Sequence, residues 1–421
     1  MSNEVVEAPL KRSAERPRPR LPALAGVRVV VALHIYFFHI MQAHRAGLLT
    51  FELLDGLPAP LARLLERGFI STGLFFQLSG LLLAYAYLNA EGRPKVSDRS
   101  FWWGRFMRLY PLYFLSLLLL VPAPALLPIT AKPASMGSLL GMAATNLTLT
   151  QAWFPTFAIA WNAPAWALSA FAFFYVVFPS FARLIADWSR KSLQILLVGL
   201  VVLSWLPAMA YLVWNPEGNG WTAISVTLGG FWLNVLRFDP LVWLPQFLSG
   251  VVLGRLIGLQ VDGSESKLSD APAGWLSVGD SVAGALVLVL AFVPDIPYVL
   301  LRHGLLVPIT LAILADLARG QGLIARGLTW RGFERVSEAS FGLFALQMPA
   351  GVWFAIAALR SAQGTTLQLM GMITSTFIAA ILWTEAVQRP LLQQLRKVKS
   401  TVHTTRAKSI SEQTQEVRAA A

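Results

Sequence analysis

The stretch LAGVRVVVALHIYFFHIM occupies residues 24–41 and decides the class of protein. It is close to the length of one membrane-crossing helix, which needs about 20 largely apolar residues, yet it contains an arginine and two histidines. Hydrophobic residues make up 56% of the 421-residue chain and charged residues 13%, about half the charged content of a typical soluble domain. This composition excludes a disordered protein, a DNA-binding domain and an ordinary cytosolic enzyme, and it predicts a polytopic membrane protein.

Nine further apolar stretches follow, and with the first they predict an all-α bundle of about ten transmembrane helices. The ten predicted spans lie near residues 23–42, 68–88, 109–130, 164–186, 192–213, 240–258, 276–296, 298–318, 338–358 and 367–387. The segment 136–154 is also apolar, but its Thr, Asn and Gln side chains would each need a partner in hydrocarbon. We therefore expect this segment to be re-entrant or interfacial.

The positive charge of the chain indicates its orientation in the membrane. Lysine and arginine number 34 against 22 aspartates and glutamates, a formal net charge of +12. With the N-terminus inside, the predicted cytoplasmic segments hold 25 of the basic residues and the outer segments hold 7. Cytoplasmic segments of membrane proteins collect Lys and Arg in this way. The charge is thus explained by topology without a nucleic-acid partner, and both termini are predicted to be cytoplasmic.

The two ends of the chain are predicted to be basic cytoplasmic tails. Residues 1–20 contain five basic residues and three prolines without an apolar core, which predicts a disordered tail and not a signal peptide. Residues 391–421 mix basic residues with Ser, Thr and Gln, and we expect this tail to lie near anionic membrane lipids. Cysteine is absent, and no paired-histidine spacing or glycine-rich phosphate loop is present. We predict no metal site and no permanently bound cofactor.

Ionisable residues in the first span are candidates for function, because such side chains are costly in hydrocarbon. Arg28 and His39 are eleven positions apart, so on a helix they share one face and lie roughly 16 Å apart along its axis. His34 lies about 140° around the helix from His39 and does not share that face. Simpler interpretations remain open: Arg28 can reach lipid phosphates, and His39 can merely link two helices.

A second candidate region is FWWGRFMRLYPLYFL at residues 101–115, just before the third predicted span. Arg105 and Arg108 are three positions apart, so on a helix they project from one face at the cytoplasmic border. Two guanidinium groups there can bind lipid phosphates, or they can clamp the phosphates of a soluble anionic cofactor. The spacing alone does not separate these alternatives.

Five segments, taken in order, resemble the acyltransferase-3 family of bacterial membrane O-acyltransferases, which acylate sugars in polysaccharides, lipopolysaccharide, Nod factors and macrolides. The first two are the Arg28 and His39 pair and LFFQLSGLLL at 74–83. The third is Arg105 and Arg108 followed by a Tyr-Pro at 110–111. The last two are PAWALSAFAFFYVVFP at 164–179 and the closing pair FGLFALQMP and VQRPL. The similarity runs from about residue 21 to residue 395.

Four positions depart from the family pattern. They are Phe171, Gly73, Gln347 and Gln388, where the family has glutamate, aspartate, histidine and glutamate, respectively. Three of the four family residues are carboxylates. If the missing glutamate orients the histidine, this protein uses another group, works with lower activity or belongs to a divergent subfamily. The candidates within or beside the predicted spans are Asp280, Asp316, Glu338 and Glu385. The sequence favours none of them over the others.

The resemblance implies that residues 21–390 form a membrane domain that transfers an acyl group, often acetyl, from acyl-coenzyme A to a hydroxyl group. The implied acceptor is a carbohydrate, a lipid-linked glycan or a macrolide-type molecule, and the implied location is a bacterial plasma membrane. Because a hydroxyl nucleophile needs a base that titrates near the working pH, His39 is the predicted catalytic base, or alternatively a transient acyl carrier. Arg28 is the second predicted catalytic residue; three turns from His39, it is expected to hold part of the coenzyme.

The predicted coenzyme-binding residues are Arg105, Arg108 and Tyr110. Because these residues lie at the cytoplasmic face and His39 lies in the outer half of its span, the reading implies a cavity open to both sides of the membrane. Two other functions stay open. A ten-helix transporter or flippase would usually show broken helices in two related halves, and no such pairing is visible. The loss of the four polar family positions nevertheless gives the transporter some weight. The other open function is a catalytically silent relative that only binds acyl-coenzyme A.

Overall fold

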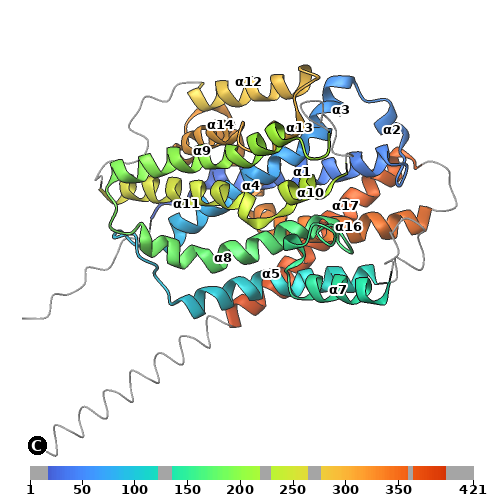
Figure 1. The fold of residues 1–421 in the computed structure, drawn as a ribbon, viewed down its shortest axis with the longest axis horizontal. Helices are drawn as coiled ribbons and strands as arrows, with labels where there is room; N and C mark the ends of the chain where they lie inside the picture. Colours follow the sequence, from blue (N-terminus) through green and yellow to red (C-terminus); the bar gives the residue numbers. More distant parts are fainter. Residues whose placement is uncertain (1–17, 122–134, 219–228, 264–275, 359–363, 395–421) are drawn as a thin grey trace, which may run out of the picture.

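Long helices that run side by side form the molecule (Figure 1). The computed structural model describes residues 18–121, 135–218, 229–263, 276–358 and 364–394. Over these ranges the chain forms helices and no β-strand, with isolated bridges at Phe51–Gly364 and Leu88–Pro94. The predicted all-α class is therefore confirmed. Most of the two predicted tails, residues 1–17 and 395–421, lies outside the described residues.

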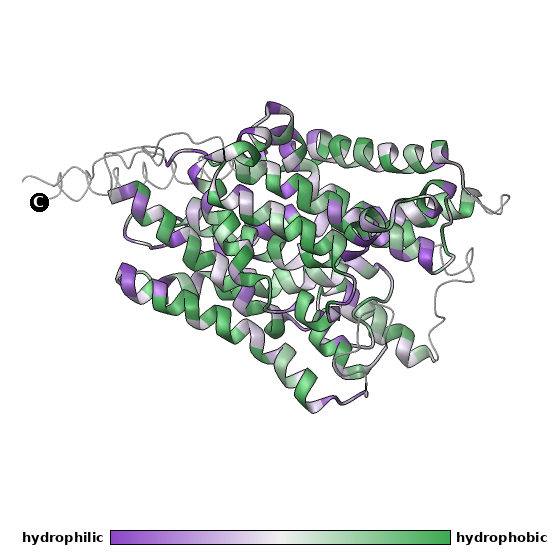
Figure 2. Cartoon of the chain, turned by 90° about the horizontal axis from the view of Figure 1, so that it is seen from above, coloured by the Kyte–Doolittle hydropathy of each residue, from purple (hydrophilic) through white to green (hydrophobic). Residues whose placement is uncertain are grey.

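Eight helical segments in the described part of the chain are long and apolar enough to cross a membrane. In chain order they are α1 (Pro22–Arg45); α3 (Ala59–Glu66), η1 (Arg67–Ile70) and α4 (Ser71–Tyr87), which are continuous; η3 (Ala163–Ala165) with α8 (Trp166–Leu184); α9 (Arg190–Trp214); α10 (Phe231–Phe238) with α11 (Pro240–Gly263); α13 (Tyr298–Arg302) with α14 (Val307–Arg319); α16 (Arg331–Ala358); and α17 (Thr366–Trp383) with the π-helical turn η5 (Thr384–Gln388). The chain is thus a multi-pass membrane protein, and apolar residues dominate the helices in Figure 2.

The two remaining predicted spans correspond to α5 (Asp98–Leu120) and α12 (Val278–Phe292). Helix α5 begins earlier than predicted, because Ser97 is an extended N-cap and Asp98 lies in the first turn, where the helix dipole favours a carboxylate. Arg105 and Arg108 therefore lie well inside a helix and not before one. Helix α12 has 15 residues, fewer than the roughly 20 that a straight crossing needs. It lies at the upper edge of the bundle in Figure 1.

The segment predicted to be re-entrant or interfacial is a short helix followed by turns. Helix α7 (Met136–Leu147) has 12 residues, which at about 1.5 Å each is too short to cross the hydrocarbon layer. After it, Thr145 and Thr148 bond to backbone carbonyls one turn earlier, and the chain turns into η2 (Gln151–Trp153). The two threonine hydroxyls, which argue against a membrane-crossing segment, thus find hydrogen-bond acceptors in the backbone of the same segment.

Helices α4 and α11 approach each other closely in the centre of the bundle. A Cβ atom at Gly250 or Gly254 of α11 would overlap the backbone of α4 at the carbonyls of Gln77 and Leu81. In the same way, a Cβ atom at Gly80 of α4 would overlap the carbonyl of Phe247. Small residues spaced four apart allow such backbone contact between membrane helices, and the gain is dispersion contact along the whole seam.

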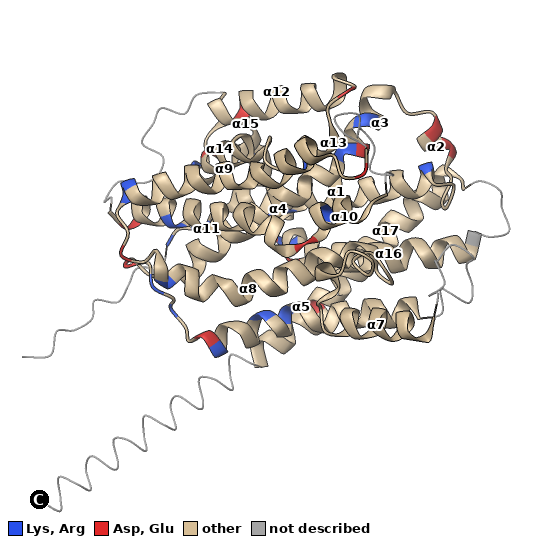
Figure 3. Cartoon of the chain, in the orientation of Figure 1, with Lys and Arg blue, Asp and Glu red and all other residues tan. Residues whose placement is uncertain are grey.

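Two short helices, α2 (Glu52–Asp55) and α15 (Gly322–Leu328), complete the helices of the described part of the chain. The carboxylate of Asp280 joins α12 to α15, because it accepts bonds from the backbone N–H groups of Ser277, Leu323 and Ile324. Charged residues gather toward the ends of the helices, and a few lie inside the bundle (Figure 3). Those internal charges lead to the site described next.

The α4–α11 seam predicts a strong effect of a single added side chain. We expect Gly250→Val to lower the free energy of unfolding by about 1–3 kcal/mol, the usual cost of overpacking, because its Cβ has no space beside Gln77. Thermal unfolding of the detergent-solubilised protein measures this. Gly199→Ala on α9 is the matched control, since a Cβ there meets nothing within 4 Å. Equal unfolding temperatures for Gly250→Val and the wild type would contradict the close packing of α4 against α11.

Candidate active site

A cavity of about 600 Å³ lies among residues 18–21 and helices α1, α4, α5, α8 and α16. We call it the arginine cavity. Its basic lining residues are Arg18, Arg20, Arg28, Lys95, Arg105 and Arg108. Glu338 is the one acidic residue in the lining among the residues that the structure describes. A chamber with this balance of charge attracts anions, and its low-dielectric walls strengthen the attraction.

Three of the predicted site residues meet in this cavity. Arg28 comes from α1, and Arg105 and Arg108 come from α5. The Nη2 atom of Arg105 donates to the hydroxyl of Tyr87, and its guanidinium carbon lies 4.7 Å from the centre of the Tyr87 ring. Arg28 and Arg108 form no hydrogen bond or ion pair with any other residue in the described ranges. Their donors are therefore available to a ligand or to water.

The acidic group of the cavity is already paired. Glu338 Oε2 lies 2.8 Å from the guanidinium of Arg389, which also contacts Glu385. Glu338 is thus the one of the four candidate carboxylates that reaches the site. Asp280 caps helices, Asp316 packs against Gly279 away from the cavity lining, and Glu385 pairs with Arg389 outside the lining. Glu338 therefore only weakly reduces the positive electrostatic potential of the arginines in the cavity.

An aromatic wall stands where the resemblance expects a glutamate. Phe171 lines the cavity, and its ring lies 5.6 Å from that of Phe75 and 5.8 Å from that of Tyr175. Behind it, Phe76 and Phe174 continue the cluster at 5.0 Å and 6.0 Å from Phe171. The side chain at this position packs and cannot accept or donate a proton. No acid from elsewhere takes its exact place among the residues that line the cavity.

His39 lies on the same helix as Arg28 but is not among the residues that line the arginine cavity. Its Nδ1 atom is 2.9 Å from Oε1 of Gln347 on α16. The amide nitrogen of Gln347 donates to the carbonyl of Phe344, so its oxygen is the acceptor and His39 Nδ1 bears the proton. The lone pair is then on Nε2, which is the state that a base requires. The arginine cavity, as lined by the described residues, therefore does not extend from Arg28 to His39, in contrast to the expected continuous chamber.

Tyr110 does not lie in the cavity, in contrast to its predicted role in coenzyme binding. Its hydroxyl donates to the carbonyl of Leu147 on α7 at 2.9 Å, and its ring stacks on Phe106 at 4.8 Å. The tyrosines that do line the cavity are Tyr85, Tyr87 and Tyr175. Tyr175 could have been found from the sequence, because it follows Phe171 by one helical turn within the PAWALSAFAFFYVVFP motif.

The sequence profile of a family described as "Acyltransferase domain" matches residues 21–384. The chain belongs to the acyltransferase-3 family. It is 29% identical to Acyltransferase MdmB of Streptomyces mycarofaciens over 246 residues, which cover 56% of this chain and 58% of that protein. It is 33% identical to Protein 2 in picA locus of Rhizobium radiobacter over 107 residues, which cover 25% of this chain and 47% of that protein. The chain thus aligns with about half the length of these relatives. No solved structure matches the chain.

The pairing of Glu338 with Arg389 predicts how the cavity responds to removal of its acid. We expect Glu338→Gln to strengthen binding of inorganic pyrophosphate roughly fivefold, because one repulsive charge near the anion is lost. Calorimetric titration of the solubilised protein measures this. Glu385→Gln is the matched control, since Glu385 contacts the same Arg389 but does not line the cavity. An equal gain in both variants would show that the effect comes from Arg389 and not from the cavity.

Proposed function

We propose that this protein is a membrane O-acyltransferase that moves an acyl group, acetyl in the simplest case, from acyl-coenzyme A to a hydroxyl of a carbohydrate or glycosylated acceptor. The observation that supports this most directly is the convergence of Arg28, Arg105 and Arg108 on one cavity of about 600 Å³. Two of these guanidiniums have no partner among the described residues, and Arg guanidiniums bind phosphate oxygens bidentately. Family membership provides the class of reaction.

In this proposal the phosphates of the coenzyme bind the arginines, and the aromatic wall shields the rest of the donor. Arg28 holds the donor together with α5 and does not act on the reacting carbonyl, since His39 is about three helical turns away. The pantetheine arm of coenzyme A is a long linear chain with the thioester at its end. The arm then has to pass beyond the present inner end of the cavity, between α1 and α16, to bring the thioester to His39.

The chemical step assigned to His39 is proton acceptance from the acceptor hydroxyl. Nε2 takes the proton while the hydroxyl oxygen bonds to the thioester carbon, the C–S bond breaks, and the coenzyme thiolate leaves and recovers the proton. Gln347 holds the ring in the tautomer that leaves Nε2 free for this step. The proposed setting is a bacterial plasma membrane with both termini in the cytoplasm, where acyl-coenzyme A is found, and the charge asymmetry of the chain supports this orientation.

A second candidate, a protein that binds acyl-coenzyme A without turnover, is favoured by two observations. His39 lies outside the arginine cavity, and Phe171 replaces the carboxylate of the family pattern on its wall. Binding of the coenzyme and transfer of the acyl group therefore have to be measured separately. The two experiments below do this.

Binding is tested through the arginines of α5. We expect coenzyme A to raise the unfolding temperature of the solubilised protein, and Arg105→Gln/Arg108→Gln to abolish that rise, because both guanidiniums face the cavity. Arg99→Gln is the matched control, as Arg99 lies on the same helix but does not line the cavity. A wild-type protein that coenzyme A does not stabilise would contradict the proposed donor, and a transporter would then be the better interpretation.

Transfer is tested through His39. We expect His39→Ala to lower kcat for acyl transfer by about 10²–10⁴-fold, the usual contribution of a general base, with donor binding unchanged. Mass spectrometry of the acceptor glycan in membranes measures the product. His34→Ala is the matched control, because His34 is on the same helix but bonds to Ser71 and to the carbonyl of Leu64. Full activity of the His39 variant would remove the proposed mechanism.

A further inference from the structure

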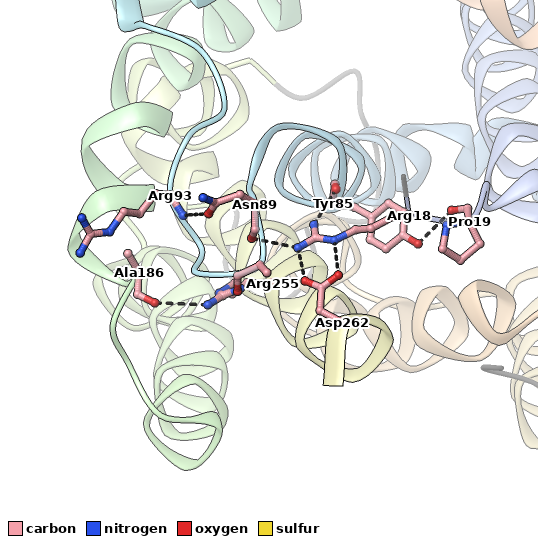
Figure 4. A network of polar contacts seen from close by, with 9 residues as sticks. Arg18, Pro19, Tyr85, Asn89, Arg93, Ala186, Arg255 and Asp262 are labelled. Carbon is pink, nitrogen blue, oxygen red and sulfur yellow. Dashed lines mark hydrogen bonds and ion pairs between the residues drawn. The ribbon is translucent and has the colours of Figure 1, made fainter. Parts of the chain in front are cut away.

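Residues 18–21 cross the mouth of the arginine cavity and contribute four lining residues to it. We call this segment the strap. It directly precedes α1 and none of its residues is helical, so its position depends on side-chain contacts. Figure 4 shows these contacts, with Arg18 at their centre between Tyr85, Asn89 and Asp262.

Arg18 ties the strap to the end of α4. Its Nη1 atom donates to the carbonyl of Tyr85 at 2.7 Å, and Nη2 donates to the carbonyl of Asn89 at 3.0 Å. The last carbonyls of a helix lack partners within the helix and form its negative end, so a guanidinium is favoured there. The hydroxyl of Tyr85 in turn donates to the carbonyl of Pro19 at 2.9 Å. The strap and α4 are thus joined in both directions.

Arg18 also ties the strap to the end of α11. Its Nε and Nη2 atoms contact the two carboxylate oxygens of Asp262 at 3.0 Å and 2.6 Å, which is a bidentate ion pair. The Arg18 side chain is 7% exposed, and that of Asp262 is 21% exposed. Gly258 lies one turn before Asp262, and a Cβ there would be 3.0 Å from the Arg18 guanidinium. The glycine therefore leaves the space that Arg18 fills.

Arg255 of α11 also holds the chain segment that follows α4. Its Nη1 atom donates to the carbonyl of Ala90 at 2.7 Å, and its Nη2 atom donates to that of Ala186 at 3.3 Å. The chain after α4 is thus fixed by Arg18 at one carbonyl and by Arg255 at the next. Gly92 has a positive φ of 81° and packs against Arg255, which a side chain at that position would prevent.

Arg20 is the residue that the strap presents to a ligand. It lines the cavity, is exposed, and has no hydrogen bond or ion pair within the part of the chain that the structure describes. Two residues away, Arg18 uses four of its five N–H donors to hold the strap, on Tyr85, Asn89 and Asp262. Arg18 therefore holds the strap in position, and Arg20 is available to a ligand in the cavity.

We propose that Arg18 is a positioning residue of the donor site, which anchors the strap so that Arg20 meets the phosphates of the acyl donor at the mouth of the arginine cavity. This inference rests on the function proposed above, but it concerns residues that the resemblance does not include. Loss of the anchor leaves Arg20 attached to a segment without a fixed position. The donor then binds less tightly, while the chemistry at His39 is unaffected.

The test compares Arg18→Ala, Arg20→Ala and Arg93→Ala in full-length protein in membranes, with acetyl-coenzyme A as donor. We expect the first two variants to raise KM for the donor roughly tenfold, the equivalent of one charge-assisted hydrogen bond, with kcat within about twofold of wild type. Arg93→Ala is the matched control: Arg93 forms an exposed ion pair with Asp187 at the same end of the molecule and does not line the cavity. Its KM is expected to stay at the wild-type value.

Trypsin provides a readout that does not depend on turnover, because the Arg20–Leu21 bond lies in the strap. We expect slow cleavage of this bond in the wild type, slower cleavage with coenzyme A, and fast cleavage in Arg18→Ala. Unchanged KM in Arg18→Ala and Arg20→Ala would overturn the inference. So would a raised KM in Arg18→Ala alone, because the anchor would then have only a structural role. A wild-type protein without donor binding would instead overturn the proposed function, and the cleavage pattern would still report on the anchor.

Discussion

Placing guanidinium groups inside a membrane bundle is the constraint on which the site depends. Arg28, Arg105 and Arg108 are attached to helices whose other faces are apolar, and a charge in hydrocarbon is costly unless it meets water or a counter-charge. The one carboxylate that lines the cavity, Glu338, is already paired with Arg389. The bundle therefore has to keep an open chamber around these arginines. The mutual repulsion of the arginines in this chamber would be reduced by any anion that enters it.

The glycines of α11 connect this chamber to the packing of the helices. Gly250, Gly254 and Gly258 recur every four residues, which places them on one face. The first two bring α11 against the backbone of α4, and the third leaves room for Arg18. The ends of the two helices consequently meet where Tyr85 and Asp262 both bind Arg18. The same close approach that stabilises the centre of the bundle thus sets the position of the cavity mouth.

Hydropathy was sufficient to predict the class and most of the spans, because a crossing helix must be long and apolar whatever its neighbours are. Only the family pattern predicts that Arg28 shares a site with Arg105 and Arg108. Spacing alone does not predict it, because Arg28 is far from the other two residues in the sequence. Tyr110, predicted to bind the coenzyme, does not line the cavity: two positions from Arg108, it lies about 200° around α5, and its hydroxyl bonds to the end of α7. The separation of His39 from the cavity could not be predicted, because it depends on which buried side chains fill the seam between α1 and α16.

Two of the positions that depart from the family pattern lie in different surroundings, Phe171 on the wall of the arginine cavity and Gln347 beside His39. Phe171 removes a carboxylate from the wall of the arginine cavity, which leaves its field free for an anion. Gln347 orients His39 through a neutral amide oxygen. A carboxylate in that position would stabilise the imidazolium strongly, whereas an amide fixes the same tautomer with less stabilisation of the charge. Position 347 has a histidine in the family pattern, whereas the missing glutamate is at Phe171 on the wall of the arginine cavity. The amide of Gln347 therefore fixes the tautomer of His39 without replacing that carboxylate.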